Sequence, residues 1–198
     1  MKWLPVAVLV TLLAGCSSLR TAPSAPPIPE LASSHLATVA ALRNWRLTAR
    51  IGVQRDNQGF SADLDWREQD GAFDLRLAAP LNGGTFALAG DADAVSLRAP
   101  KGEHYVADSA EALMQTHFGW ALPVSGARHW IKGIPAPEST PTQEVRDAEG
   151  RWTDFAQDGW RVSIVDYTRV AGTSLPRKLF LNRDDMKVRL VIKAWERD

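Results

Sequence analysis

Cys16 is the residue with the most distinctive chemistry in this chain, because it is the only cysteine among 198 residues. It directly follows Leu12-Leu13-Ala14-Gly15, and Lys2 is the only charged residue before it. A cationic start, a short apolar segment and small residues at a cleavage point are the parts of a secretory signal peptide, and this segment is too short to span a bilayer. We therefore expect residues 1–15 to be removed, which leaves Cys16 at the new amino terminus.

The segment resembles the lipobox of bacterial lipoproteins, in which the cysteine is diacylated, the preceding peptide is removed and the new amino terminus is acylated. The resemblance implies that Cys16 is the lipid-attachment site. Two or more fatty chains anchor a protein stably to a membrane, whereas one chain binds only marginally. Ser17 comes next; in enterobacterial lipoproteins an aspartate there favours the inner membrane, so serine is compatible with the outer one. The alternative is an ordinary secretory peptide with an incidental cysteine.

The other residue types that carry chemistry form no recognisable site in the sequence. The four histidines have no short zinc-ligand spacing, and the one cysteine is not free to bind metal if it is acylated. Ser125-Gly126 lacks the rest of a nucleophile motif, and the chain has neither a glycine-rich phosphate loop nor a dinucleotide fingerprint. We therefore expect no catalytic residues, no metal and no cofactor, and we interpret the protein as a non-enzyme.

The charge balance argues against nucleic acid as a partner. The chain has 23 Lys and Arg against 23 Asp and Glu, and removal of residues 1–15 takes away one cation, Lys2. A near-neutral domain lacks the basic surface that attracts phosphates. A single cysteine also excludes an intramolecular disulfide, so stability must come from an apolar core, which a chain of this size can build.

Proline marks the boundary between the anchor and the folded domain. Residues 16–32 contain four prolines and few large apolar side chains, a composition typical of an extended tether. The tether would carry the acylated cysteine and hold the domain, residues 33–198, away from the bilayer. Residues 33–43 then have apolar residues at helical spacing behind a serine, which predicts a short amphipathic helix.

From Trp45 the apolar residues recur at every second position, which is the period of a half-buried strand. Such alternation covers residues 45–54, 60–67 and 73–79, and Asp70-Gly71 predicts a tight hairpin between the last two. The same reasoning predicts eight more short strands, at residues 86–89, 95–99, 103–107, 144–146, 152–156, 160–167, 175–182 and 187–195. About eleven antiparallel strands must curl in order to bury one face.

Two helices are expected between the strands. Asp108-Ser109-Ala110-Glu111 has the form of a capping box and begins a helix that Gly119 can end. Pro123 begins another, which stops at Gly133, and the proline-rich residues 134–141 are expected to cross the surface. The expected fold class is mainly β (α+β): an incomplete antiparallel β-barrel of about eleven strands covered by three helices. A small barrel is either filled by side chains or holds one apolar ligand.

One loop has the composition of a membrane probe. Pro80 ends a strand and Asn82-Gly83 begins a turn, so that Leu81 lies at a rigid tip. An exposed leucine on such a tip suits contact with lipid, although single exposed apolar residues are common and need no function. The residues by themselves leave both interpretations open.

Together these residues resemble the LolB family of outer-membrane lipoproteins. The resemblance rests on the stretch Trp45–Val53, on Trp66, on the loop Pro80–Gly83, and on residues 102–113 and 123–135, in this order and spacing. It runs from the lipobox to the carboxyl end of the chain. Two departures are Ala49, where a glycine is common, and Asn82, where the loop usually has glycine after the leucine; neither removes an apolar contact.

The resemblance implies a LolA/LolB-like fold and a function without covalent chemistry. The protein would be a lipid-anchored receptor on the periplasmic side of the outer membrane, which accepts lipoproteins from the periplasmic carrier LolA and inserts them into that membrane. It would hold the acyl chains of its cargo in an apolar cavity, act as a monomer and use the protruding Leu81, with Pro80, Asn82 and Gly83, for insertion. The candidate cavity residues are apolar alternates of the first three strands: Leu47, Ile51, Phe60, Leu64, Trp66, Leu75 and Leu77.

Three alternatives remain open on sequence grounds. The protein could be a lipocalin-like lipid-binding lipoprotein that never inserts cargo, or a purely structural lipoprotein with a filled barrel. A hydrolase is the third, and the missing nucleophile–base pair disfavours it. The receptor interpretation depends on an apolar hollow, reachable from solvent, inside the curled sheet.

Overall fold

The described residues of this computed structural model are 29–80, 83–119 and 121–197, and they form eleven strands and three helices. Cys16, Leu81 and Asn82 lie outside the described residues, as do the predicted signal peptide and most of the predicted tether. The strands are β1 (Trp45–Arg55), β2 (Gln58–Gln69), β3 (Ala72–Ala78), β4 (Thr85–Gly90), β5 (Val95–Arg98), β6 (His104–Ala107), β7 (Thr142–Arg146), β8 (Trp152–Gln157), β9 (Trp160–Val170), β10 (Thr173–Arg183) and β11 (Met186–Arg197). The helices are α1 (Pro29–Ala40), α2 (Ala110–Phe118) and α3 (Val124–Trp130).

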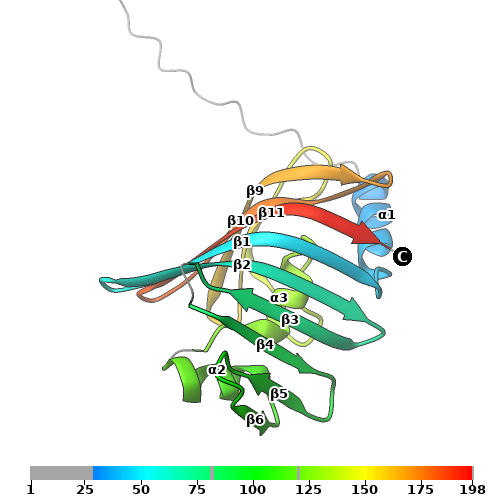
Figure 1. Ribbon diagram of the computed structural model, residues 1–198. Helices are drawn as coiled ribbons and strands as arrows, with labels where there is room; N and C mark the ends of the chain where they lie inside the picture. The colour runs from blue at the N-terminus through cyan, green and yellow to red at the C-terminus, as the bar shows by residue number, and fades with distance from the viewer. Residues whose placement is uncertain (1–28, 81–82, 120, 198) are drawn as a thin grey trace, which may run out of the picture.

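All eleven strands belong to one antiparallel sheet, in the order β6-β5-β4-β3-β2-β1-β11-β10-β9-β8-β7. The first strand pairs with the last in the middle of the sheet, and β6 and β7 form its two edges. Figure 1 shows the sheet strongly curved, with α3 behind the central strands and α2 beside β5 and β6. The predicted mainly-β fold, an incomplete barrel with three helices, is confirmed.

Strand β1 shows why the sheet has one apolar face. Its residues alternate between buried and half-exposed along most of its length. Leu47 and Ile51 are buried on the concave side, while Arg46 faces outward. On the outer face Arg46 binds Asp65 of β2, with 2.6 Å between Nη2 and Oδ2. The period of two thus separates an apolar interior from a charged exterior.

Tryptophan rings close one end of the concave side. The ring centroids of Trp45 and Trp66 are 5.8 Å apart, and the ring of Trp195 lies 5.5 Å from that of Trp45. Trp45 is the first residue of β1 and pairs with Glu68, near the end of β2. These rings therefore lie far from the turn that joins β1 to β2. We call their side of the fold the aromatic end, and the side with the β1–β2 and β10–β11 turns the hairpin end.

Helix α1 begins at Pro29, four residues before the predicted start at Ser33, so the last part of the predicted tether is helical. Proline is tolerated in the first turn of a helix, because its missing N–H would have no partner there. The helix ends at Ala40 rather than Arg43 and packs against β10. Val39, which is fully buried, anchors it.

Helix α2 is capped by a different residue from the predicted one. Ser109, not Asp108, is the N-cap, and its hydroxyl accepts a backbone N–H of the first turn at 3.2 Å. The carboxylate of Glu111 instead accepts the backbone N–H and the hydroxyl of Ser125, at 2.8 and 3.2 Å. This contact ties α2 to the first turn of α3. Gly119 ends α2 with a φ of 75°, as predicted.

The segment after α3 is partly buried, so the prediction that residues 134–141 cross the surface is wrong for their first half. Ile134 and Ala136 are buried. The side-chain amide of Gln157, itself buried, binds the N–H and the carbonyl of Ala136 at 2.9 and 2.7 Å, and the carbonyl of Ser139 at 2.7 Å. One side chain satisfies three backbone groups, which allows an irregular segment inside the fold.

Candidate acyl-chain-binding site

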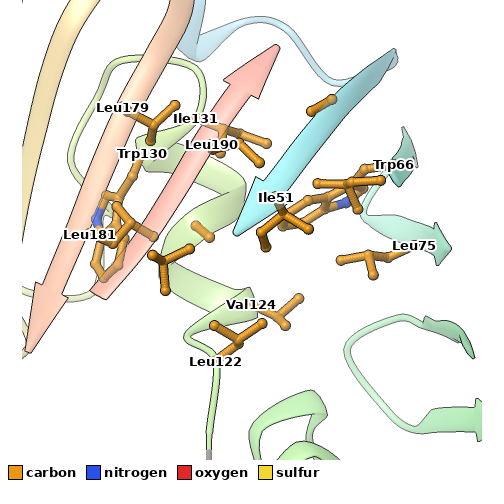
Figure 2. Packing of buried hydrophobic residues seen from close by; sticks show 14 of the residues in the cluster. Ile51, Trp66, Leu75, Leu122, Val124, Trp130, Ile131, Leu179, Leu181 and Leu190 are labelled. Carbon is orange, nitrogen blue, oxygen red and sulfur yellow. The ribbon is translucent and has the colours of Figure 1, made fainter. Parts of the chain in front are cut away.

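An apolar pocket lies between the concave face of the sheet and the helices α2 and α3. Figure 2 shows Ile51, Trp66 and Leu75 on the strand side, with Leu122 and Val124 on the helix side. Every residue that lines the pocket is apolar: Ile51, Leu64, Trp66, Leu75, Leu77, Leu88, Leu181, Val188 and Leu190 from the strands, and Met114, Leu122, Pro123, Val124, Ala127 and Ile131 from the helices and their flanks. Such a wall suits hydrocarbon and penalises a polar group.

The pocket has a volume of about 50 Å³, far smaller than the hollow that the receptor interpretation requires. Ligand pockets commonly have volumes of roughly 300–1,000 Å³. The side chains of the two layers meet here, because apolar surfaces held apart in water are unfavourable. The pocket is therefore small in this conformation, because the helix layer packs against the sheet.

The structure brings five of the seven candidate cavity residues together in this pocket, namely Ile51, Leu64, Trp66, Leu75 and Leu77. Leu47 is buried and pairs with Trp66, but it belongs to the packed core rather than to the pocket wall. Phe60 lies outside the pocket as well. It is partly buried and lines a separate cleft at the hairpin end.

The lining residues that come from α2, α3 and their flanks could not be predicted from the alternation along the strands. Val124, Ala127 and Ile131 stand at positions i, i+3 and i+7 and form the face of α3 that is turned to the sheet. Met114 is the contribution of α2. Helical spacing was the available signal, but spacing alone does not say which strands a helix covers.

Buried polar contacts hold α3 at the aromatic end. Glu68 is 5 % exposed; it accepts a hydrogen bond from the Trp66 indole at 3.1 Å and forms an ion pair with Arg128 of α3. Arg128 also donates to the carbonyl of Gly71, in the β2–β3 turn, at 2.6 Å. Burial raises the pKa of Glu68 above its usual range, and the Arg128 guanidinium opposes that shift.

Two further contacts fix the end of α3. The ammonium of Lys132 is buried and donates to the carbonyl of Leu42 at 3.3 Å, and burial lowers the pKa of Lys132. The indole of Trp130 donates to Gln157 at 2.7 Å. The second half of α3 is therefore tied to the strands, whereas its first turn is tied to α2 through Glu111.

An open cleft of about 590 Å³ lies at the hairpin end, between the β1–β2 hairpin and the last turn of α2. Val53, Phe60 and Phe118 form its apolar part. The ring of Phe118 also packs edge-on against Phe86, with centroids 4.9 Å apart. The remaining lining residues are the hairpin residues 55–59 and Gly119, which makes one side of the cleft polar.

The predicted membrane loop joins β3 to β4 at the hairpin end. Its described flanks are held by backbone hydrogen bonds, from Ala79 to Gly84 at 3.0 Å and from Gly83 to Pro80 at 3.2 Å. A side chain at position 83 would place its Cβ 2.6 Å from the Cβ of Ala79, so glycine alone fits without a shift. Pro80 and Gly83 are exposed, and the two residues between them lie outside the described part.

The histidines are dispersed in the structure. His117 stacks on Tyr105, with ring centroids 3.8 Å apart, while burial lowers the pKa of His35 and of His129. No group of three or more His, Cys, Asp and Glu side chains in the described part of the chain could hold a metal ion. Within the same residues, no helix combines the length and the apolar character needed to cross a membrane.

The curved open sheet with helices on its concave side is a fold that this chain shares with a LolA-superfamily protein. Such a protein from Nitrosomonas europaea superposes with a TM-score of 0.53 over 84 % of this chain and 93 % of its own, at 9 % identity. A DUF1329-family protein from Desulfovibrio piger superposes with a TM-score of 0.55 over 85 % of this chain and 91 % of its own, at 8 % identity. These identities are so low that the likeness shows the fold alone.

Within this class, the chain belongs to the LolB family. The family description "Outer membrane lipoprotein LolB" matches residues 43–195. The outer-membrane lipoprotein LolB of Nitrosococcus oceani is 36 % identical over 200 residues, which cover 99 % of each chain. Those of Stutzerimonas stutzeri and Pseudomonas putida are 36 % and 35 % identical over 190 residues, or 95 % of this chain and 92 % of theirs. The family indicated by the sequence motifs is confirmed.

Proposed function

We propose that this protein is an outer-membrane receptor that accepts lipoproteins from the periplasmic carrier LolA and inserts them into the outer membrane. Its family membership supports the location. The observation that carries the proposal is the wholly apolar pocket between the sheet and the helices, because the acyl chains are the part of a lipoprotein that such a wall binds. Transfer is non-covalent, and the protein works as a monomer.

Burial of the acyl chains drives their capture. Each methylene group removed from water contributes roughly 0.8 kcal/mol, so a chain with about 14 buried methylenes gains on the order of 10 kcal/mol. The same figure makes release of a chain into water very slow. Cargo therefore passes directly from the carrier to the opened pocket, without an exposed intermediate.

The direction of transfer comes from affinities rather than from nucleotide hydrolysis. Cargo moves from carrier to receptor to bilayer when each site in turn holds the chains more favourably. A pocket that must first open against its own packing binds a chain more weakly than a pre-formed cavity does. The small volume of the pocket in this structure thus favours release of the cargo to the bilayer.

Residues outside the described part complete the proposal. Cys16 carries the acyl anchor that keeps the domain at the outer membrane, and Leu81 contacts the bilayer during insertion. The described flanks of the loop support this role, because Gly83 has no room for a side chain and Pro80 restricts the backbone. The loop also lies at the hairpin end, where the aromatic rings do not block the pocket.

The test mixes the soluble Cys16→Ala variant with LolA that carries a radiolabelled lipoprotein, and then separates the two proteins by an affinity tag on the receptor. We expect the label to move to the receptor. Ala127→Phe, on the pocket face of α3, should prevent this transfer, while Ala112→Phe, on the exposed face of α2, should not. A folded receptor that leaves the label on LolA would refute the proposal. A lipocalin-like protein would bind free lipid and take nothing from the carrier.

A further inference from the structure

The cleft at the hairpin end adjoins the apolar pocket along both of its walls. On the strand side, Val53 lines the cleft and pairs with Val188, which lines the pocket. Pocket residue Ile51 is two positions from Val53, roughly 7 Å along the strand. On the helix side, Phe118 of the cleft follows Met114 of the pocket by one turn, about 6 Å. The cleft therefore lies directly outside the pocket.

The closed end of the pocket sets the orientation of a bound chain. Trp66 lines the pocket at the aromatic end, and the rings of Trp45 and Trp195 pack behind it. An acyl chain must therefore enter with its methyl end toward Trp66. Its polar head then stays at the hairpin end, in the cleft between the β1–β2 hairpin and α2. Figure 1 shows this hairpin and α2 on the same side of the molecule.

The polar groups of this cleft suit an uncharged head. Arg55 is the single cation among the described residues that line the cleft. Its Nε donates to Asp185 at 3.1 Å and its Nη1 donates to the carbonyl of Gly119 at 3.2 Å, so its charge is already compensated. The side-chain amides of Asn57 and Gln58 are exposed and form no hydrogen bond with another described residue. An amide both donates and accepts, which matches ester and peptide groups.

A phosphate fits the cleft poorly. Phosphate recognition uses free cationic donors, above all arginine, and Arg55 is engaged. The carboxylate of Asp56 is the one anionic side chain among the described lining residues, and it would repel a phosphate. This difference matters because the chains of a membrane phospholipid would fit the apolar pocket as well as those of a lipoprotein.

We propose that this cleft is a head-group site, which binds the acylated, uncharged cysteine of a cargo lipoprotein and the peptide groups next to it, and which disfavours phospholipids. The inference rests on the proposed function, because the acyl chains must occupy the pocket. It adds a source of selectivity, since the pocket itself recognises only hydrocarbon. The head-group site is defined by Asp56, Asn57, Gln58, Phe60 and Phe118.

The test measures binding of two probes to the soluble Cys16→Ala protein: a synthetic triacylated cysteinyl peptide, and a long-chain fatty alcohol with the same acyl length. Asn57→Ala with Gln58→Ala should weaken lipopeptide binding about tenfold, through the loss of two hydrogen bonds, and leave alcohol binding unchanged. Gln54→Ala is the matched control, because Gln54 is an exposed amide on the same hairpin that does not line the cleft. Circular dichroism establishes that each variant is folded.

A competition experiment tests whether the cleft disfavours phospholipids. Asp56→Asn removes the carboxylate and keeps a residue that tolerates the φ of 51° at this turn. Phosphatidylglycerol should then displace the lipopeptide several-fold more effectively than it does from the unaltered cleft. Lipopeptide binding that is the same with and without the two amides would overturn the head-group site and leave the proposed function standing. If the Cys16→Ala protein with an unaltered cleft binds neither probe, both the proposed function and the head-group site are refuted.

Discussion

Replacement of Arg128 by glutamine tests whether its ion pair with Glu68 holds α3 against the sheet. The side chain of Glu68 is 5 % exposed and that of Arg128 is 26 % exposed. Removal of one partner of a buried pair costs about 3–5 kcal/mol, because the remaining charge stays in a site of low dielectric constant. Since water reaches Arg128, we expect Arg128→Gln to lower the free energy of unfolding by a smaller amount, about 2–3 kcal/mol.

A double-mutant cycle separates the ion pair from the other contacts of Arg128, such as its hydrogen bond to the carbonyl of Gly71. Glu68→Gln keeps an acceptor for the Trp66 indole, so we expect it to cost about 1 kcal/mol. The double variant buries no charge at this point. It should therefore be at least about 1 kcal/mol more stable than the sum of the two single losses predicts.

Urea denaturation, followed by tryptophan fluorescence, measures the four free energies of the cycle. Arg128→Lys serves as the control, because it keeps the charge but replaces the planar guanidinium by a compact ammonium. The uptake rate of a fluorescent acyl probe gives the functional readout. It should rise in Arg128→Gln, since α3 carries Val124 and Ala127 of the pocket wall. Losses that add to within about 0.5 kcal/mol would show that the pair is not coupled and would refute the reasoning.

Three further predictions test separate parts of the molecule. Leu81→Glu should leave cargo uptake intact and block delivery to liposomes. Leu36→Glu, on the exposed side of α1, should affect neither. Undiminished delivery by Leu81→Glu would contradict the role of Leu81 in membrane contact. Because burial raises the pKa of Glu68, the carboxyl binds a proton more readily in the folded protein than in the unfolded one. The free energy of unfolding should therefore fall as the pH rises through that raised pKa. In Glu68→Gln, the urea midpoint should not show this decrease with pH. Gln157→Leu removes the hydrogen-bond partner of the N–H and carbonyl of Ala136, of the carbonyl of Ser139 and of the Trp130 indole. It should lower the free energy of unfolding by about 2–3 kcal/mol, measured in urea; a loss below about 1 kcal/mol would contradict this.

The strands and the apolar face of the sheet could be predicted because both follow from local spacing. Burial alternates with residue number along a strand, so Ile51, Leu64 and Trp66 could be placed on the inner face before any tertiary contact was known. The ends of the helices were less certain. Glu111 stands where a capping box requires it, yet its carboxylate binds Ser125 of α3, a partner that local spacing does not reveal.

The sequence by itself determined the family, the number of strands and the side chains of the concave face. Only the tertiary structure decided that α3 covers this face, that Phe60 belongs to a cleft outside the pocket, and that the pocket has a volume of about 50 Å³. The alternation that includes Leu64 also includes Phe60, so a one-dimensional pattern cannot separate them. The physical reason is that a pocket is the space left between two packed layers, and its volume depends on contacts between residues far apart in the chain.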